Sequence, residues 1–555
     1  METQSTTTKG LALLHGCLTG RSITTGLLSS LLLCPIGSWP ARAIERLEFE
    51  IDGTVLPVSV ADLRSFERLG DRSRSELATW LRLLDTESRK ELISLFNAPV
   101  LTRRSLGQQL LNSWGAGPLI DALGSLIRVE GGGRISSSVV LPTLERLLLK
   151  QAQVSTLDVL QALPAQHLRL DLNALIDTAN HWFKQLERHN GLMAALAAKP
   201  ITHNGKPNPL SASFSGVPQS KASPWKEPQK LDLAVLHREG PIQLQIWSSS
   251  VFPSSPKRPW LLLMPGLGGS PEHFDWLAGT LAEASWVVVV VKHPGSDAAA
   301  VRAFLDGQQS FDGAKALRQR LADLNSVLEE QRKGQIPVEG TNVVLIGYSF
   351  GALTALLAAG ASPVSGIDHR CRQSLAAIPV TNLSELLQCE LADSRALKIS
   401  PIYPQPIAVV GLNSFGGLIW PNYHQTQPLN IPLLLIGGTL DLITPPLDEQ
   451  IALLSGLGHH PLSQAIVVEG ASHFSPIRVG NQSESFRGND LFQLNENLVG
   501  VNPLVVQKLI AMEMINFLEQ LDSNVTAASV GHFNLGSIRW HRLNRNAAKR
   551  LIRNF

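Results

Sequence analysis

The sequence predicts an α/β protein with a mostly parallel sheet covered by helices on both faces. Six short segments beyond residue 230 are apolar on both faces, which is typical of buried parallel strands. Helical segments separate them, as crossovers between parallel strands require. The six strand segments are residues 260–264, 286–291, 342–346, 407–410, 431–436 and 465–468.

The clearest helix between these strands follows Asp312. Asp312 stands at the position of an N-cap, where a carboxylate accepts hydrogen bonds from the first N–H groups of a helix. The pattern therefore predicts a crossover helix with one face on the sheet. That face is formed by four leucines at helical spacing, Leu317, Leu321, Leu324 and Leu328.

Composition excludes several classes of protein. Of the 555 residues, 44% are hydrophobic and 17% are charged, which suits folded domains rather than a disordered chain or a coiled coil. Lysine and arginine number 48 against 46 aspartates and glutamates, so the chain lacks the basic excess that nucleic-acid binding usually needs. The four cysteines are too widely spaced for a zinc site of the paired C-x-x-C type. We expect no nucleic-acid partner, no metal and no cofactor.

The first 43 residues have the features of a signal peptide. Residues 22–41 carry no charge, and the segment ends in Ala41-Arg42-Ala43, which offers signal peptidase the two small residues it needs. We expect cleavage after Ala43 and export to the periplasm or the extracellular space. An uncleaved membrane anchor formed by residues 22–41 is the alternative, although its Ser, Thr, Gly and Pro make it a poor span.

Cleavage would leave two cysteines, Cys371 and Cys389, in an oxidising compartment. We expect them to form a disulfide. Closing a loop of this length stabilises a domain by about 3 kcal/mol in the chain-entropy account. Two buried reduced thiols are the alternative, and it gains weight if the chain is not exported.

The chain ahead of the predicted sheet divides into two parts. Residues 44–199 begin with alternating apolar runs around Asp52-Gly53, a β-hairpin signal, and continue with helical stripes after Ser75. This predicts a hairpin followed by a mainly helical domain. Residues 200–230 contain six prolines and many serines and are predicted to be a linker. The α/β domain would then span residues 231–523.

The strongest chemical signal is the G-x-S-x-G motif at residues 347–351, which joins the strand at 342–346 to a helix-forming segment. By itself the motif is weak, because it occurs by chance in long chains. Between a strand and a helix, its glycines permit the sharp turn that exposes a strained serine at a helix N-terminus. Ser349 is therefore the candidate nucleophile, and Gly347 and Gly351 are the glycines of its turn.

A serine hydroxyl attacks an ester only with the help of an imidazole base, and the imidazole needs an acceptor that fixes its tautomer. Asp441 and His473 follow the strands at 431–436 and 465–468, in the serine–aspartate–histidine order of hydrolases. The carboxyl ends of parallel strands share one edge of a sheet, so we expect the three side chains to meet there. The alternatives are an aspartate that only caps a turn and a histidine without a special role.

Acyl transfer also needs two backbone N–H groups that hold the oxyanion. One belongs to the residue after the nucleophile, Phe350. We expect the other from Leu267, in the glycine-rich turn 265–269 that follows the first predicted strand. A phosphate-binding loop is the competing interpretation, but the turn matches neither G-x-G-x-x-G nor G-K-[ST].

Together these pieces resemble the α/β-hydrolases, and among them the proteins similar to plasma-type platelet-activating-factor acetylhydrolase and to predicted dienelactone hydrolases. The resemblance implies an α/β-hydrolase fold over residues 231–523 and a serine esterase acting on lipid or phospholipid acyl esters. Dienelactone hydrolases carry cysteine where this chain has Ser349, and the acetylhydrolases carry histidine where it has Tyr348. Residues 44 to about 175 also resemble an uncharacterised helical domain found ahead of such hydrolases in cyanobacteria. The matching motifs lie at residues 265–268, 292–296, 347–351, 438–441 and 470–474.

Three further segments are candidates for shaping specificity. Residues 361–404 are predicted to form a cap over the site, and residues 475–502 a mobile lid or a long loop. Residues 524–555 are predicted to be a basic tail that either docks on anionic lipid or is a frayed, solvated end. The apolar residues that would line an acyl site or form the core of the cap are Leu383, Leu386 and Leu387.

The expected reaction is the two-step hydrolysis of a small-molecule or lipid ester through an acyl-enzyme. Two alternatives stay open. The hydrolase fold could serve as a non-catalytic scaffold that binds a partner, or the same three residues could serve a thioesterase or a peptidase.

Overall fold

A computed structural model of the protein describes part of the chain. The predicted signal peptide, most of the predicted linker and most of the 475–502 segment lie outside the described residues. The residues that the structure describes are 46–51, 53–69, 72–75, 78–79, 99–102, 120–121, 124, 126–129, 136–151, 153–163, 165, 167–201, 227–249, 258–305, 308–309, 311–392, 402–421, 425–477, 502–521 and 527–555.

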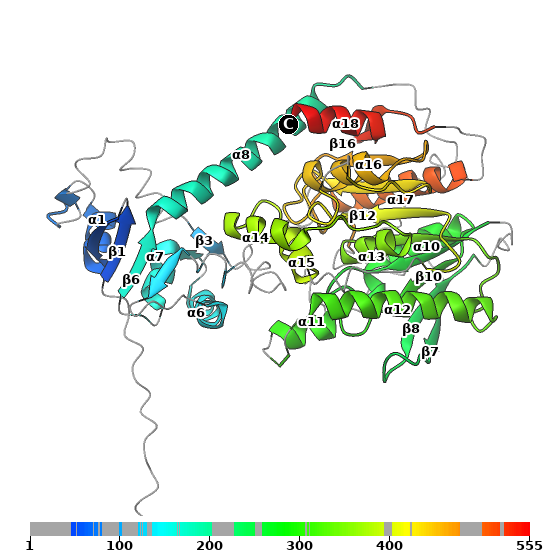
Figure 1. Ribbon diagram of the computed structural model, residues 1–555, viewed down its shortest axis with the longest axis horizontal. Helices are drawn as coiled ribbons and strands as arrows, with labels where there is room; N and C mark the ends of the chain where they lie inside the picture. The colour runs from blue at the N-terminus through cyan, green and yellow to red at the C-terminus, as the bar shows by residue number, and fades with distance from the viewer. Residues whose placement is uncertain are drawn as a thin grey trace, which may run out of the picture. The chain divides into compact units, whose positions relative to one another are not determined.

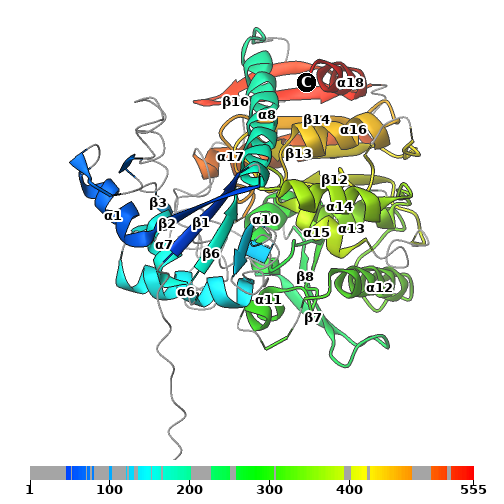
Figure 2. The same ribbon diagram turned by 60° about the vertical axis from the view of Figure 1, so that its left-hand side comes forward.

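A ten-stranded sheet organises residues 229–555, with the strand order β15-β16-β14-β13-β12-β11-β9-β10-β8-β7. Its six central strands pair in parallel and confirm the six predicted segments. The outer strands at both edges pair antiparallel. Figure 2 shows β12, β13, β14 and β16 lying in this order. The strands are β7 (Gln229–Leu233), β8 (Ile242–Trp247), β9 (Trp260–Met264), β10 (Val288–Val291), β11 (Val343–Tyr348), β12 (Ala408–Leu412), β13 (Leu433–Gly438), β14 (Gln464–Val468), β15 (Gly531–Leu535) and β16 (Ile538–Asn544).

Helices cover both faces of this sheet (Figure 1). Alternate residues of one strand enter two different cores: Leu262 of β9 packs with α12 and α13, whereas Leu261 and Leu263 pack with α10 and α17. Helix α12 is the predicted crossover helix, and its N-cap Asp312 accepts a hydrogen bond from the Lys315 N–H. The helices are α10 (Asp275–Glu283), α12 (Gly313–Arg332), α13 (Phe350–Ala358), α16 (Ala452–Leu457), α17 (Pro503–Leu521) and α18 (Arg545–Asn554).

The N-terminal part contains more sheet than the sequence predicts. The hairpin is confirmed, because β1 and β2 pair antiparallel around Gly53 at a φ of 76°. Strands β6 and β4 extend it to a four-stranded sheet, and β3 pairs with β5. These strands of three to five residues are too short to show a period of two beside long helical stripes. The elements are β1 (Arg46–Ile51), β2 (Thr54–Ser59), α1 (Val60–Leu69), β3 (Pro99–Thr102), β4 (Ile127–Val129), α6 (Ser137–Lys150), β5 (Gln153–Ser155), α7 (Thr156–Ala162), β6 (His167–Asp171) and α8 (Leu172–Ala197).

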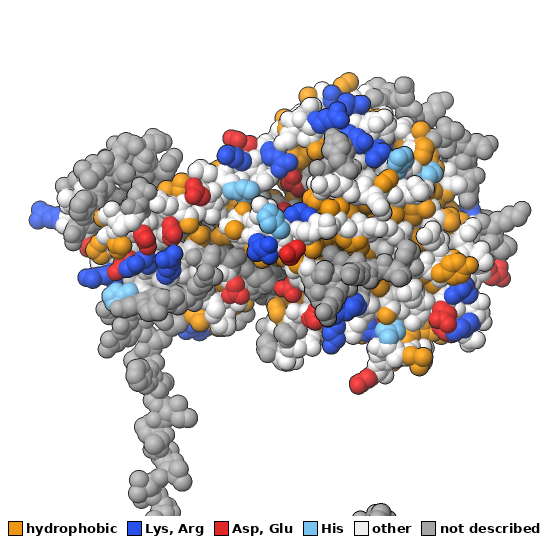
Figure 3. Space-filling view, in the orientation of Figure 1, with side chains coloured by type: hydrophobic (Ala, Val, Ile, Leu, Met, Phe, Trp, Pro, Cys, Tyr) orange, Lys and Arg blue, Asp and Glu red, His pale blue; other side chains and the backbone are white. Residues whose placement is uncertain are grey.

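The prediction of a basic tail at residues 524–555 is wrong for its described part. Residues from Gly531 onward form β15, β16 and α18, and β16 pairs with β14 inside the large sheet. Arg542 forms an ion pair of 2.7 Å with Glu513 rather than standing free in solvent. Basic side chains do gather over α18 (Figure 3). Docking on anionic lipid therefore stays a prediction for this helix.

Replacing Trp540 with alanine tests whether β16 is part of the core. Trp540 is buried, stacks on Phe533 and donates from Nε1 to Glu513 Oε1 at 2.9 Å. We expect the change to lower the free energy of unfolding by about 3–5 kcal/mol, as for other buried aromatic residues. Urea denaturation measures it, with Arg550→Ala on the exposed side of α18 as a control that changes stability by less than about 0.5 kcal/mol. Equal effects of the two changes would contradict the fold at this edge.

The segment predicted to form a cap contains two helices joined by the predicted disulfide. Helix α14 (Ile367–Ala377) carries Cys371 and α15 (Ser384–Glu390) carries Cys389, with Cα atoms 5.3 Å apart. Its leucines form core rather than an acyl pocket, because Leu383 and Leu386 pack against Leu126 and Ile378 and Leu387 packs in the core with α12. None of the described helices is long and apolar enough to cross a membrane.

Candidate active site

Ser349 stands between β11 and α13 with a backbone that non-glycine residues rarely adopt. Its φ is 51° and its ψ is −115°. The two flanking glycines are required by close backbone approach: a Cβ on Gly347 would overlap the backbone of Gly351, and one on Gly351 would overlap the carbonyl oxygen of Met264. The G-x-S-x-G pattern therefore reflects α13 beginning directly against the end of β9.

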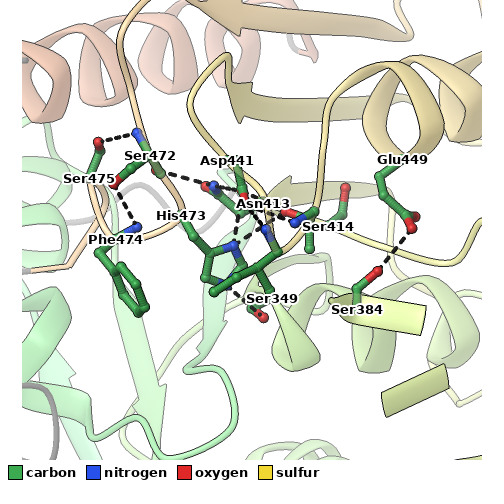
Figure 4. Close-up of polar contacts among 12 residues, drawn as sticks. Ser349, Ser384, Asn413, Ser414, Asp441, Glu449, Ser472, His473, Phe474 and Ser475 are labelled. Carbon is green, nitrogen blue, oxygen red and sulfur yellow. Dashed lines mark hydrogen bonds and ion pairs between the residues drawn. The ribbon is translucent and has the colours of Figure 1, made fainter. Parts of the chain in front are cut away.

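The structure brings Ser349, His473 and Asp441 together, as the sequence predicts (Figure 4). His473 Nε2 lies 3.2 Å from Ser349 Oγ, and His473 Nδ1 lies 2.9 Å from Asp441 Oδ2. The three residues follow β11, β14 and β13, so their side chains share the carboxyl edge of the sheet. The line from hydroxyl to imidazole to carboxylate is the arrangement that activates a serine nucleophile.

Asp441 is fully buried and surrounded by hydrogen-bond donors. Its Oδ1 accepts from the N–H groups of Ile443 and Thr444 at 2.9 and 2.7 Å, and its Oδ2 accepts from the Thr444 hydroxyl at 2.6 Å. Burial works to raise the pKa of Asp441, but the charge of His473 and the hydrogen bonds from His473 and Thr444 outweigh it and hold the pKa below its ordinary value. The carboxylate therefore stays ionised and can stabilise a protonated imidazole.

Two residues at the site were missed by the sequence-based prediction. Asn413 follows β12 with a φ of 48° and donates from Nδ2 to Asp441 Oδ2 at 2.6 Å. Its place after a predicted strand, and the tolerance of asparagine for positive φ, were available signals. Tyr348 donates its hydroxyl to the His473 carbonyl oxygen at 2.9 Å, and the two rings lie 5.3 Å apart. Burial, followed by the charge of Asp441, raises the pKa of Tyr348 well above its ordinary value, so the phenol keeps its proton.

The two candidate oxyanion donors lie beside Ser349. Phe350 is the first residue of α13, and Leu267 is in a turn closed by a 3.2 Å hydrogen bond from the Gly269 N–H to the Gly266 carbonyl oxygen. Gly268 supplies the positive φ of 70° that the third position of a type II turn requires. A Cβ on Gly266 would lie 3.2 Å from the Cβ of Ser349, so the turn directly adjoins the serine. Neither the Leu267 nor the Phe350 N–H donates to another described residue.

A central parallel strand leads through a strained serine into a helix, and the aspartate and histidine follow later strands at the same edge. The fold is that of the α/β-hydrolases. Within the described residues, no cluster of His, Cys, Asp and Glu side chains could hold a metal ion.

One family model matches part of the chain. Residues 43–171 match the model of a family described as "Alpha/beta hydrolase of unknown function (DUF1400)". The match lies ahead of the ten-stranded sheet and so does not include Ser349, Asp441 or His473. No curated protein matches the chain.

Several solved structures are similar to the chain. Thermogutta terrifontis esterase 2 phosphoramylated by tabun is 14% identical, with a TM-score of 0.32, over 54% of this chain and 96% of that one. The same esterase phosphorylated by paraoxon is 15% identical, with a TM-score of 0.32, over 54% and 95%. A serine hydrolase without a lid from Xanthomonas campestris is 19% identical, with a TM-score of 0.27, over 45% and 87%.

Proposed function

We propose that the protein is a serine hydrolase that cleaves carboxylic esters through an acyl-enzyme. The observation that carries this proposal is the hydrogen-bonded line from Ser349 Oγ through His473 to Asp441. His473 Nε2 takes the proton of Ser349 as Oγ bonds to the ester carbonyl carbon, and Asp441 stabilises the imidazolium. The N–H groups of Leu267 and Phe350 hold the resulting oxyanion.

The second half of the reaction reuses the same groups. His473 gives its proton to the leaving alkoxide, which departs as an alcohol and leaves the acyl group on Ser349. Water then attacks the acyl carbon while His473 accepts one of its protons, and collapse of the oxyanion returns that proton to Ser349 and releases the acid.

For the substrate we propose a small-molecule or lipid ester. The resemblance of the motifs at residues 265–268 and 470–474 to those of acetylhydrolases supports a lipid or phospholipid acyl ester. Initial rates on p-nitrophenyl esters and phosphatidylcholines of increasing acyl length would define the substrate, and matched acyl thioesters would separate an esterase from a thioesterase.

Covalent labelling with a fluorophosphonate probe tests the proposed nucleophile. The probe phosphonylates a serine only when a base and an oxyanion hole activate it. We expect one adduct per chain, located by peptide mass spectrometry on Ser349, and no adduct after denaturation in urea. A folded protein that is not labelled, or is labelled elsewhere, would favour a non-catalytic scaffold.

A further inference from the structure

A buried arginine lies beneath both candidate oxyanion donors. Arg320 of α12 is only 1% exposed. Its Nη1 donates to the Pro265 carbonyl oxygen at 2.7 Å and its Nη2 to the Gly266 carbonyl oxygen at 2.8 Å. The guanidinium therefore binds two successive carbonyl oxygens of the turn that contains Leu267.

The hydrogen bond from Arg320 to the Gly266 carbonyl oxygen sets the direction of the Leu267 N–H. The Gly266 carbonyl and the Leu267 N–H belong to one peptide unit, and in a trans peptide the two point in opposite directions. Among the described residues the only cis peptide precedes Pro404, so this unit is trans. With its carbonyl held toward Arg320, the N–H faces away from the arginine and is free to meet the substrate oxygen.

The same guanidinium also contacts the second donor residue. Its Cζ lies 4.8 Å from the centre of the Phe350 ring, a cation–π distance. Phe350 begins α13, so the contact holds the residue whose N–H is the second proposed oxyanion donor. Arg320 thus contacts the peptide unit of Leu267 and the side chain of Phe350, the two proposed oxyanion donors.

A neighbouring loop, at residues 293–296, is hydrogen-bonded to both Arg320 and the turn. Arg320 Nε donates to the Ser296 hydroxyl at 2.8 Å, and the Gly268 N–H donates to the Ser296 carbonyl oxygen at 2.9 Å. Asp323, fully buried on the same helix, accepts from Arg238 at 2.9 Å and lies 2.8 Å from His293 Nδ1. These contacts tie the loop at residues 293–296 to the turn at 265–269.

Burying an arginine is costly unless its charge and donors are matched. Each of the three guanidinium nitrogens of Arg320 donates a hydrogen bond, and Asp323 and Asp297 lie near enough to offset its charge. Burial lowers the pKa of Arg320 to about 9 against the opposing effect of Asp323, so the group is still charged at neutral pH. An aliphatic residue could fill the same volume but could hold neither carbonyl.

We propose that Arg320 is a positioning residue that holds the Leu267 and Phe350 amides in the geometry that binds the oxyanion. This inference rests on the proposed serine hydrolase function. It assigns to Arg320 an effect on the transition state rather than on the binding of the ester.

Arg320→Met, which keeps length and apolar bulk, tests the assignment, with Arg320→Lys as a second variant. Arg318→Met is the matched control, because Arg318 is exposed on the same helix. The measurements are kcat and KM on p-nitrophenyl acetate, and inhibition by a trifluoromethyl ketone, which forms a tetrahedral adduct, against its methyl ketone, which does not.

In Arg320→Met we expect kcat to fall by about 10²–10³-fold, the loss typical of a missing oxyanion donor, with KM changed by less than about threefold. The trifluoromethyl ketone should lose affinity by a similar factor while the methyl ketone does not. Lysine offers one point charge instead of a fork, so Arg320→Lys should lose at least about tenfold in kcat. Arg318→Met should behave as wild type.

Several outcomes would overturn the inference. A folded Arg320→Met protein with wild-type kcat would overturn it. Equal losses of affinity for the trifluoromethyl ketone and the methyl ketone would also overturn it, because they would indicate a general structural role. If Arg320→Met does not fold, a wild-type kcat in Arg320→Lys decides against the inference in the same way. Wild-type protein without ester hydrolysis would overturn the proposed function as well, so the two failures are distinguishable.

Discussion

Ser349→Ala is expected to lower kcat/KM for ester hydrolysis by about 10⁴–10⁶-fold, because alanine removes the only atom that can bond to the acyl carbon. The residual hydrolysis would come from direct attack of water on the ester, assisted by the oxyanion donors. Initial rates on p-nitrophenyl acetate measure the loss, and an unchanged midpoint in urea shows that the protein is still folded. Hydrolysis at the wild-type rate would refute the assignment of Ser349.

His473→Ala should cost about as much as Ser349→Ala, and the double variant should cost no more than either single one. The reason is that the two groups act as a unit: a serine without its base, or a base without its serine, contributes almost nothing. Losses that multiply in the double variant would instead indicate two independent contributions.

Asp441→Asn should lower kcat by about 10⁴-fold, because it would leave His473 in the wrong tautomer. The N–H groups of Ile443 and Thr444 both point at Oδ1, so the amide oxygen of an asparagine must take that position. Its NH₂ group would then face His473 Nδ1, donor against donor, and Nε2 would carry the proton instead of accepting it. Asn413→Ala is the control, since it removes a donor to Oδ2 without reversing the polarity of the site.

Gly351→Ala is expected to destabilise the fold by more than about 4 kcal/mol, beyond the usual range for one substitution. The new Cβ would overlap the carbonyl oxygen of Met264, a backbone atom at the end of β9 in the middle of the sheet. Neither side can move away, because β9 is paired on both edges and the helix begins at Phe350. Loss of expression as soluble protein, or a large fall in the urea midpoint, would report the clash.

Gly240→Ala is the matched control for Gly351→Ala. A Cβ on Gly240 would meet nothing within 4 Å, so we expect a change in stability within about 0.5 kcal/mol. If both alanine variants were equally stable, the close approach of α13 to β9 would be wrong.

The central parallel strands were predictable because they are buried on both faces and are therefore almost entirely apolar. The meeting of Ser349, Asp441 and His473 was predictable for a related reason. In a parallel sheet, residues that follow different strands arrive at one edge whatever the intervening chain does. The serine turn carried its own local signature, since only glycine fits where Gly347 and Gly351 lie against backbone.

The strands at the C-terminus were mistaken for a tail because their basic residues dominate the composition. Arg542 lies in β16 and is neutralised by Glu513 on α17, a partner 29 positions away. Charge along a sequence shows how many basic residues there are, but not which of them find a buried carboxylate.

The linear sequence thus determined the class of fold and the identity of the three residues proposed for the chemistry, because both follow from local patterns and from the order of strands. The tertiary structure alone decided what supports them: Asn413 on the aspartate, Tyr348 on the histidine and Arg320 under the oxyanion turn. Such contacts join side chains to backbone groups that are distant in the chain, and no periodicity or motif records which carbonyl a buried donor will reach.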